Sequence, residues 1–209
     1  MTITAGVVAV QGDVSEHAAA VRRAARAHGH GRSGTGSGEP REAAEVHEIR
    51  TSGIVPDCDV LLVPGGESTT ISRLLARQGI DEEIREHVRA GKPLLATCAG
   101  LIVASRDAKD DRVETLDLLD VSVDRNAFGR QVDSFEAPLS VTGLDEPFPA
   151  VFIRAPMIDE VGADVEVLAT WEDRPVAVRQ GSILATSFHP ELTDDDRIHR
   201  LAFFETVPA

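Results

Sequence analysis

Cysteine and lysine are both scarce in this chain, and the two scarcities exclude different classes of protein. Cysteine occurs only at positions 58 and 98 of the 209 residues. Two cysteines do not make the disulfide framework of a small secreted domain, so a protein of the reducing cytoplasm is expected. Lysine also occurs only twice, and 35 acidic against 21 basic residues give a net charge of −14. Because such a surface repels nucleic acid and anionic lipid, neither is expected as a partner.

Long apolar runs are absent as well. No run approaches the roughly 18 residues of a membrane-spanning helix. The first residues, MTITAGVVAVQGD, lack the basic start of a signal peptide and predict a strand instead. No repeat or linker divides the chain, so a single domain over residues 1–209 is expected. Abundant Asp and Glu with little Lys resembles proteins from high-salt cytoplasms. An acidic face for one basic partner is the alternative.

The order of apolar segments predicts an α/β fold with a mixed, mainly parallel central sheet. The final helix is expected to take Thr193 as its N-cap, and the helix at 67–78 to be capped through the Ser and Thr near its start. Several strands of the second half are expected to pair antiparallel. Strands are expected at 3–10, 46–50, up to 63, 94–97, 121–126, 134–141, 150–155, 165–171, 175–180 and 182–188, and helices at 14–27, 67–78, 81–90, 99–105 and 193–207.

Residues 28–45 stand apart because they are polar and rich in Gly and Ser at their start. This composition predicts a flexible surface insertion. His28, His30 and His47 lie in or beside it, but neither a nearby cysteine nor a tight spacing supports a metal site. No metal is therefore expected.

The stretch LLATCAGLI, residues 94–102, places one cysteine between an expected strand and an expected helix. Small residues flank Cys98, as a nucleophile elbow requires, because that turn brings backbones close together. The start of the following helix favours thiolate over thiol, and the amide after the nucleophile can help to hold an oxyanion. On this stretch alone, a buried and unreactive cysteine is the alternative.

The stretch SFHPEL, residues 187–192, offers a base for such a nucleophile. Pro190 favours an extended His189, and residues two apart in an extended segment point the same way. Glu191 is therefore expected beside His189, where a carboxylate orients an imidazole and stabilises its charged form. A strand-end histidine with a solvated glutamate is the alternative. A cysteine elbow in the same sheet favours the triad of Cys98, His189 and Glu191.

The glycine turn in PGGESTT, residues 64–70, follows one expected strand and precedes a helix. Its open backbone amides suit an anion or a carbonyl oxygen. The lysine of a phosphate-binding P-loop is absent, so nucleotide binding is not expected.

Taken together, these residues resemble a class I (triad) glutamine amidotransferase. Longer stretches narrow the resemblance to the glutaminase subunits of pyridoxal 5'-phosphate synthase, the PdxT/SNO family. They follow one another in order over almost the whole chain, and the fourth and fifth are not general amidotransferase features. The stretches are VQGDVSEH (10–17), PGGESTT (64–70), TCAGLI (97–102), RNAFGRQVDSF (125–135), FIRAP (152–156) and SFHPEL (187–192).

The resemblance implies a three-layer α/β sandwich of the flavodoxin-like type that hydrolyses L-glutamine to glutamate and ammonia, with no cofactor and no metal. The ammonia would pass to a separate synthase subunit, within a large hetero-oligomer, that builds pyridoxal 5'-phosphate from a pentose phosphate and a triose phosphate. Cys98 is then the nucleophile that forms a thioester, His189 the general base and acid, and Glu191 the group that orients His189.

The resemblance also implies the substrate site. The backbone N–H groups of Ala99 and Gly66 are expected to form the oxyanion hole, and Gln11 is expected to sense docking of the synthase beside it. The positions that match the family's glutamine-binding residues are Gly66, Glu67, Ser68, Arg125, Ile153 and Arg154. Without the resemblance, the two arginines would be assigned to surface ion pairs.

Two departures from the family and two alternatives remain. Ala96 stands where a glycine is often found, and the connection at 28–45 is longer than usual; it could alter a partner surface. The first alternative is another triad amidotransferase, or a cysteine hydrolase on a related fold. The second is a non-catalytic binding subunit, against which the complete set of Cys98, His189 and Glu191 argues.

Overall fold

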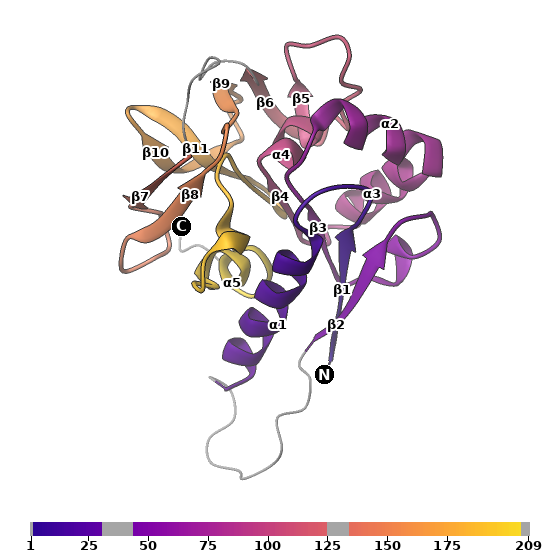
Figure 1. Cartoon of the computed structure of the whole chain (residues 1–209), viewed down its shortest axis with the longest axis horizontal. Coiled ribbons are helices and arrows are strands. Elements are labelled where there is room, and N and C mark those ends of the chain that lie inside the picture. The colour runs from indigo at the N-terminus through magenta and orange to yellow at the C-terminus, as the bar shows by residue number, and fades with distance from the viewer. Residues whose placement is uncertain (1, 31–43, 125–133, 206–209) are drawn as a thin grey trace.

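A seven-stranded sheet forms the centre of the computed structural model, which describes residues 2–30, 44–124 and 134–205 (Figure 1). The strand order is β10-β11-β12-β4-β3-β1-β2. All neighbours from β12 to β2 pair in parallel, whereas β11 runs antiparallel to both of its neighbours. The strands are β1 (Ile3–Val8), β2 (Ala44–Ile49), β3 (Val60–Val63), β4 (Leu94–Thr97), β10 (Glu166–Trp171), β11 (Arg174–Gln180) and β12 (Ile183–Thr186). The expected mixed, mainly parallel sheet is confirmed.

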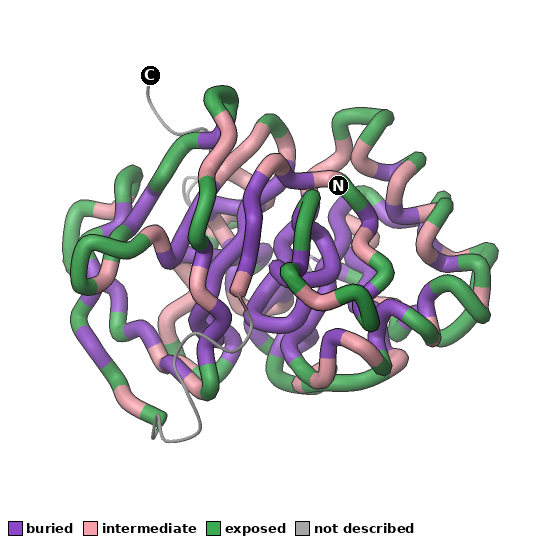
Figure 2. The backbone as a smooth tube through the Cα atoms, turned by 90° about the horizontal axis from the view of Figure 1, so that it is seen from above, coloured by how far each residue is buried: buried purple, intermediate pink, exposed green. Residues whose placement is uncertain are grey.

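Helices cover both faces of this sheet, because its central strands are apolar on both sides. In β3, Leu61 and Val63 belong to one core, and Val60 and Leu62 to the other. The first core contains side chains of α2 (Ser68–Gln78), α3 (Ile80–Arg89) and α4 (Ala99–Ala104). The second contains side chains of α1 (Val14–His30) and α5 (Arg197–Phe203), which contact each other. Figure 2 shows the buried residues gathered in the centre of the molecule, with the exposed residues around them. The fold is the expected three-layer sandwich.

Two smaller sheets and two short 3-10 helices complete the described chain. One sheet holds β5 (Ser105–Asp107), β6 (Leu119–Asp124) and β9 (Met157–Val161), and the other pairs β7 (Phe135–Leu139) with β8 (Phe148–Phe152). The 3-10 helices are η1 (Val55–Asp57) and η3 (Pro190–Leu192). The ring of Phe152 meets that of Phe188 edge-on, with centroids 5.6 Å apart, so β8 packs against the chain that leaves β12.

Several expected boundaries are wrong, and hydrogen bonds explain two of them. The last helix begins at Arg197, because Thr193 Oγ1 donates to Pro190 O (3.0 Å) and closes η3 instead of capping α5. Helix α2 is capped by the carboxylate of Glu67 and not by a hydroxyl. Strands β5 and β9 were not predicted. Within the expected insertion, residues 28–30 continue α1 and 44–45 begin β2, while 31–43 lie outside the described residues. The single domain stays a prediction.

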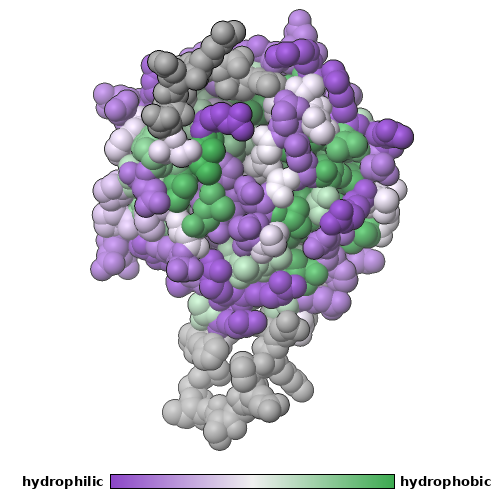
Figure 3. All heavy atoms as spheres, viewed as in Figure 1, coloured by the Kyte–Doolittle hydropathy of each residue, from purple (hydrophilic) through white to green (hydrophobic). Residues whose placement is uncertain are grey.

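Figure 3 shows hydrophilic residues over most of the visible face, with separate hydrophobic areas between them. In the part of the chain that the structure describes, no helix combines the length and apolarity needed to cross a bilayer.

We expect Gly100→Ala to destabilise the protein. A Cβ on Gly100 would lie 2.0 Å from Val63 O, so α4 or the end of β3 would have to move. Overpacking of this kind costs about 1–3 kcal/mol of unfolding free energy. Chemical denaturation at one fixed salt concentration measures the loss. Gly29→Ala is the matched control, because a Cβ there meets nothing within 4 Å. Equal stability of the two variants would contradict the prediction.

Candidate active site

The carboxyl ends of adjacent parallel strands bring the candidate site together. Thr97 of β4 and Thr186 of β12 are partners in register, so the segments after them leave the sheet side by side. The turn after β3 lies on the other side of β4, since Val63 is paired with Ala96. The loop after β1 ends at the same edge. Open α/β sheets bind their ligands at this edge, in the crevice beyond the strands.

Cys98 forms the sharp turn that its flanking residues predict. It stands between the last residue of β4 and the first of α4, with φ 50° and ψ −108°. A positive φ strains a residue with a side chain and persists only where its surroundings impose it. Here the Cys98 N–H donates to Thr186 O (2.8 Å). The side chain is almost buried, with 8% of the residue exposed. The elbow geometry of Cys98 is therefore present.

His189 lies against Cys98 and is held from two sides. Its Nδ1 lies 2.7 Å from Glu191 Oε1, and its backbone N–H donates to Val151 O (2.8 Å). Burial lowers the pKa of His189, but hydrogen bonds and charge attraction from Cys98 and Glu191 outweigh burial and raise that pKa to about 10. The imidazole is therefore protonated at neutral pH and can give a proton to a leaving group.

Glu191 is itself buried, with 4% of the residue exposed. Burial raises the pKa of its carboxyl group, while the hydrogen bond and the charge of His189 oppose that rise. Cys98, His189 and Glu191 thus lie together at this edge of the sheet.

The turn after β3 lies directly over the cysteine and the histidine. A Cβ on Gly65 would lie 2.6 Å from His189 Cε1 and 3.3 Å from Cys98 Cβ, so only glycine fits there without movement. Gly66 follows with φ 141° and is exposed. The next amide, Glu67 N–H, donates to Gln11 Oε1 (3.0 Å). The loop after β1 therefore fixes the turn that would face a substrate.

The carboxylate of Glu67 points into its own helix. It accepts from Thr69 N (3.2 Å), Thr70 N (2.7 Å) and Thr70 Oγ1 (2.8 Å). Partial burial raises the pKa of Glu67, but the hydrogen bonds from Thr70 and Thr69 outweigh it and lower the pKa to about 2. Binding of a substrate by the Glu67 carboxylate, as expected from the sequence, would therefore compete with its hydrogen bonds to the start of α2. Ser68, the first residue of α2, is buried.

The other expected substrate positions differ in how the structure places them. Ile153 and Arg154 follow β8, just after the Val151 carbonyl that holds His189, so they reach the same edge. Ile153 is half-buried, and Arg154 is exposed with φ 43°. Ala99 directly follows Cys98, and its N–H, the first of α4, has no acceptor within the helix. Arg125 lies outside the described residues.

Asp13 and His17, for which no role was predicted, lie at the centre of this site. Asp13 Oδ2 is 3.6 Å from His189 Nδ1, and His17 Nε2 is 3.4 Å from Glu191 Oε2. Both belong to the stretch VQGDVSEH, where an acid and a histidine close behind the first strand were the available signal. The ligand atoms of Asp13, His189 and Glu191 lie within 4.8 Å of one another, so a cation there would compete with the bond between His189 and Glu191.

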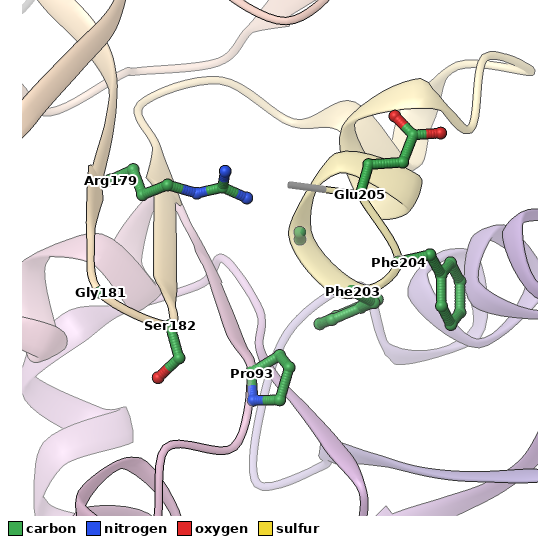
Figure 4. A pocket seen from close by; sticks show the side chains of 8 residues that line it. Pro93, Arg179, Gly181, Ser182, Phe203, Phe204 and Glu205 are labelled. Carbon is green, nitrogen blue, oxygen red and sulfur yellow. The ribbon is translucent and has the colours of Figure 1, made fainter. Parts of the chain in front are cut away.

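A cavity of about 420 Å³ lies at the opposite edge of the sheet (Figure 4). Pro93 precedes β4, and Gly181 and Ser182 precede β12, so this cavity borders the amino ends of the same strands. Its remaining lining comes from Arg179 and from the end of α5 and the residues after it. It is separate from Cys98.

Comparison with solved structures defines the class. A chain described as "Crystal structure of glutamine amidotransferase" matches with a TM-score of 0.79 and 44% identity, over 94% of this chain and 95% of its own. A second match, "Structure of PurLQS from Thermotoga maritima", has a TM-score of 0.62 over 95% of this chain and 92% of its own; at 19% identity it supports the fold alone. The fold is that of a glutamine amidotransferase.

Sequence comparison then identifies the family. The chain belongs to the SNO glutamine amidotransferase family, whose model matches residues 7–208. "Pyridoxal 5'-phosphate synthase subunit PdxT" of Halobacterium salinarum is 73% identical over 100% of this chain and 97% of its own. The proteins of the same name from Haloarcula marismortui and Methanosarcina acetivorans are 70% and 52% identical, over 99% and 93% of this chain and 99% and 94% of their own. Halophilic relatives agree with the high-salt interpretation of the acidic composition.

We expect the pKa of His189 to fall in Cys98→Ala and in Glu191→Gln, because each change removes a group that stabilises the charged ring. NMR titration of the imidazole nitrogens measures it, starting from about 10 in the unaltered protein. Cys58→Ala is the control, since Cys58 is buried elsewhere and bonds to Ile54 O. A wild-type His189 that titrates near 6.5 would refute the ion-pair geometry.

Proposed function

We propose that this chain hydrolyses L-glutamine to L-glutamate and ammonia, as the glutaminase subunit of a pyridoxal 5'-phosphate synthase. The observation that carries the proposal is the Cys98 elbow, with its positive φ, set against the bonded pair of His189 and Glu191. The shared name of the relatives and the family match support the reaction and its setting. The ammonia would serve vitamin B6 synthesis on a separate synthase subunit, in a hetero-oligomer.

In the first half of the reaction, the Cys98 thiolate attacks the side-chain amide carbon of glutamine. The carbonyl oxygen becomes an oxyanion, and we assign its two donors to the backbone N–H groups of Ala99 and Gly66. The His189 imidazolium gives its proton to the amide nitrogen, which leaves as ammonia. The products of this half are a thioester on Cys98 and a neutral His189.

In the second half, His189 takes a proton from water while the water oxygen attacks the thioester carbon. The tetrahedral intermediate collapses to glutamate and the Cys98 thiolate, and His189 is again protonated. Glu191 stabilises the charged ring in both halves through its bond to Nδ1 (2.7 Å). The net reaction is glutamine plus water to glutamate plus ammonia.

The proposed substrate site surrounds Cys98, His189 and Glu191. Arg154 is an exposed cation at the same edge and suits the α-carboxylate of glutamine, with Arg125 as a second candidate from the sequence. The backbone at Gly66, the helix start at Ser68 and the half-buried Ile153 would line the amide end. Glu67 would act through its cap on α2, which fixes the same turn.

Labelling with 6-diazo-5-oxo-L-norleucine, a glutamine-analogue alkylator, tests this proposal. We expect an adduct on Cys98 by mass spectrometry, in the presence of the synthase subunit. Cys58 is an internal control in the same chain, because burial raises its pKa to about 11 and it should stay unlabelled. Glutamine-dependent ammonia release should fall about 10³-fold or more in Cys98→Ala.

Three outcomes would reject the assignment. An unlabelled Cys98 in the complex would favour a non-catalytic binding subunit. Ammonia release stimulated by another synthase and not by this one would indicate a different amidotransferase. Hydrolysis that survives Cys98→Ala would place the nucleophile elsewhere.

Gln11→Ala tests the turn that carries the proposed oxyanion donor. Removing the side chain takes the acceptor from the Glu67 N–H and frees the Gly66 peptide. We expect synthase-stimulated ammonia release to fall by about 10-fold or more, because a loosened oxyanion donor loses part of the roughly 100-fold that such a donor contributes, with little change in the free subunit. Gln11→Glu keeps an acceptor oxygen and is the matched variant. Unchanged stimulation in Gln11→Ala would remove Gln11 from the mechanism.

A further inference from the structure

Behind Glu191, on the side away from His189, two buried histidines lie in contact. His17 of α1 and His199 of α5 are both 0% exposed, and His17 Nδ1 lies 3.3 Å from His199 Nε2. The other ring nitrogen, His17 Nε2, lies 3.1 Å from Thr97 Oγ1 and 3.4 Å from Glu191 Oε2. The reaction proposed above uses neither histidine.

Both rings are neutral at physiological pH. Burial lowers the pKa of His17 well below its ordinary value, and the charges of His199 and His189 lower it further. Burial, together with the charge of Arg23, lowers the pKa of His199 to about 3. Each ring therefore carries a single N–H, and its place follows from the neighbours.

The carboxylate of Glu191 decides where the His17 proton lies. Among the described residues, no hydrogen bond of ordinary geometry reaches the buried Glu191 Oε2, and His17 Nε2 faces it. A lone pair on that nitrogen would repel the ionised carboxylate, so Nε2 carries the proton. Nδ1 is then an acceptor and takes the Nε2–H of His199. The opposite arrangement would put a donor on His199 Nδ1, for which the described residues offer no acceptor.

We propose that His17 is a positioning residue for the Cys98–His189–Glu191 group, because its Nε2–H, bonded to Thr97 Oγ1 (3.1 Å), also faces Glu191 Oε2 at 3.4 Å and attracts it while Oε1 stays on His189 Nδ1. This inference rests on the function proposed above. His199 fixes the His17 tautomer through its bond to Nδ1. Thr97, next to Cys98, accepts from the His17 Nε2–H through its Oγ1.

The second donor matters because burial disfavours the ionised form of Glu191. Burial raises its pKa, the charge of Asp13 adds to the rise, and the bond to His189 opposes it. The titratable groups around the carboxylate are thus His189, Asp13 and His17, with His199 and Arg23 behind them. Without His17, Glu191 takes up a proton at a higher pH, and a neutral Glu191 no longer stabilises the charged His189 ring.

A matched pair of amides at position 17 separates this role from packing. The amide nitrogen of His17→Gln reaches the place of Nε2, whereas that of His17→Asn reaches only the place of Nδ1. In His17→Asn we expect the Glu191 titration midpoint, followed by carboxyl ¹³C NMR on the free chain, to rise by about one pH unit, because the N–H dipole that faces the charged Oε2 is lost. In His17→Gln it should stay at the wild-type value. Glu191→Gln assigns the signal.

Kinetics with the synthase give the second readout. In His17→Asn, kcat for ammonia release should fall about 10-fold, with KM for glutamine little changed. The acid limb of the pH profile of kcat/KM should move to higher pH, together with the titration midpoint of Glu191. His17→Gln should restore both. His87→Gln is the control, because His87 is also buried but bonds to Pro93 O in another part of the fold.

The outcomes distinguish this proposal from the proposed function. An unmoved Glu191 titration in His17→Asn, or equal behaviour of the Asn and Gln variants, overturns the role of His17. Absence of ammonia release by the wild-type complex overturns the proposed function, while the titration still decides the role of His17. If His17→Asn does not fold, His199→Leu is titrated instead; it removes the donor to His17 Nδ1, and an unmoved midpoint there also overturns the proposal.

Discussion

The parallel pairing of β4 with β12 brings together a cysteine and a histidine that lie far apart in the sequence. Thr97 faces Thr186 in register, and the Cys98 N–H is fixed by the Thr186 carbonyl. A slip of one residue would turn the side chains of β12 to the opposite face and move His189 away from the sulfur. The positive φ of Cys98 costs about 1–3 kcal/mol. It persists because β3 and β12, the neighbours of β4 in the sheet, are fully buried. The rigidity of the sheet is thus a condition for the strained turn.

The interior next to this elbow is unusually polar. Glu191, His17 and His199 are buried within two layers of apolar side chains, where an unpaired charge is strongly unfavourable. Hydrophobic residues of similar volume would often be at least as stable as a buried ionic group, so stability alone does not explain these residues. What a bonded network adds is direction, because His17 and His199 each carry one N–H and each oxygen of Glu191 has one position. The bond of 2.7 Å between His189 and Glu191 then has a fixed orientation relative to Cys98.

The parts of the site that the sequence predicted are those set by local geometry. A cysteine between a strand and small residues, and a histidine two positions before a glutamate, are patterns whose shape depends on a few neighbouring residues. The prediction for Thr193 was wrong because its hydroxyl has three local partners, Pro190 O, Asp195 O and Asp195 N, and none of them belongs to α5. Strands β5 and β9 were missed because their pairing comes from distant partners and not from alternation. The position of His17 depends on α1 packing against α5 and η3, which no window of sequence contains.

The acidic surface limits how this site can recognise a ligand. In about 1 M salt, charges in solvent are screened within about 3 Å. Exposed ion pairs on the surface then contribute little to stability, and long-range attraction of a charged ligand is lost. Recognition must then depend on contacts that exclude water. The charges of His189 and Glu191 meet this condition because they are buried. The carboxylate of Glu67 is half-buried and accepts hydrogen bonds from the start of α2, which offset its negative charge. The same turn can therefore offer backbone donors on a surface with a net charge of −14.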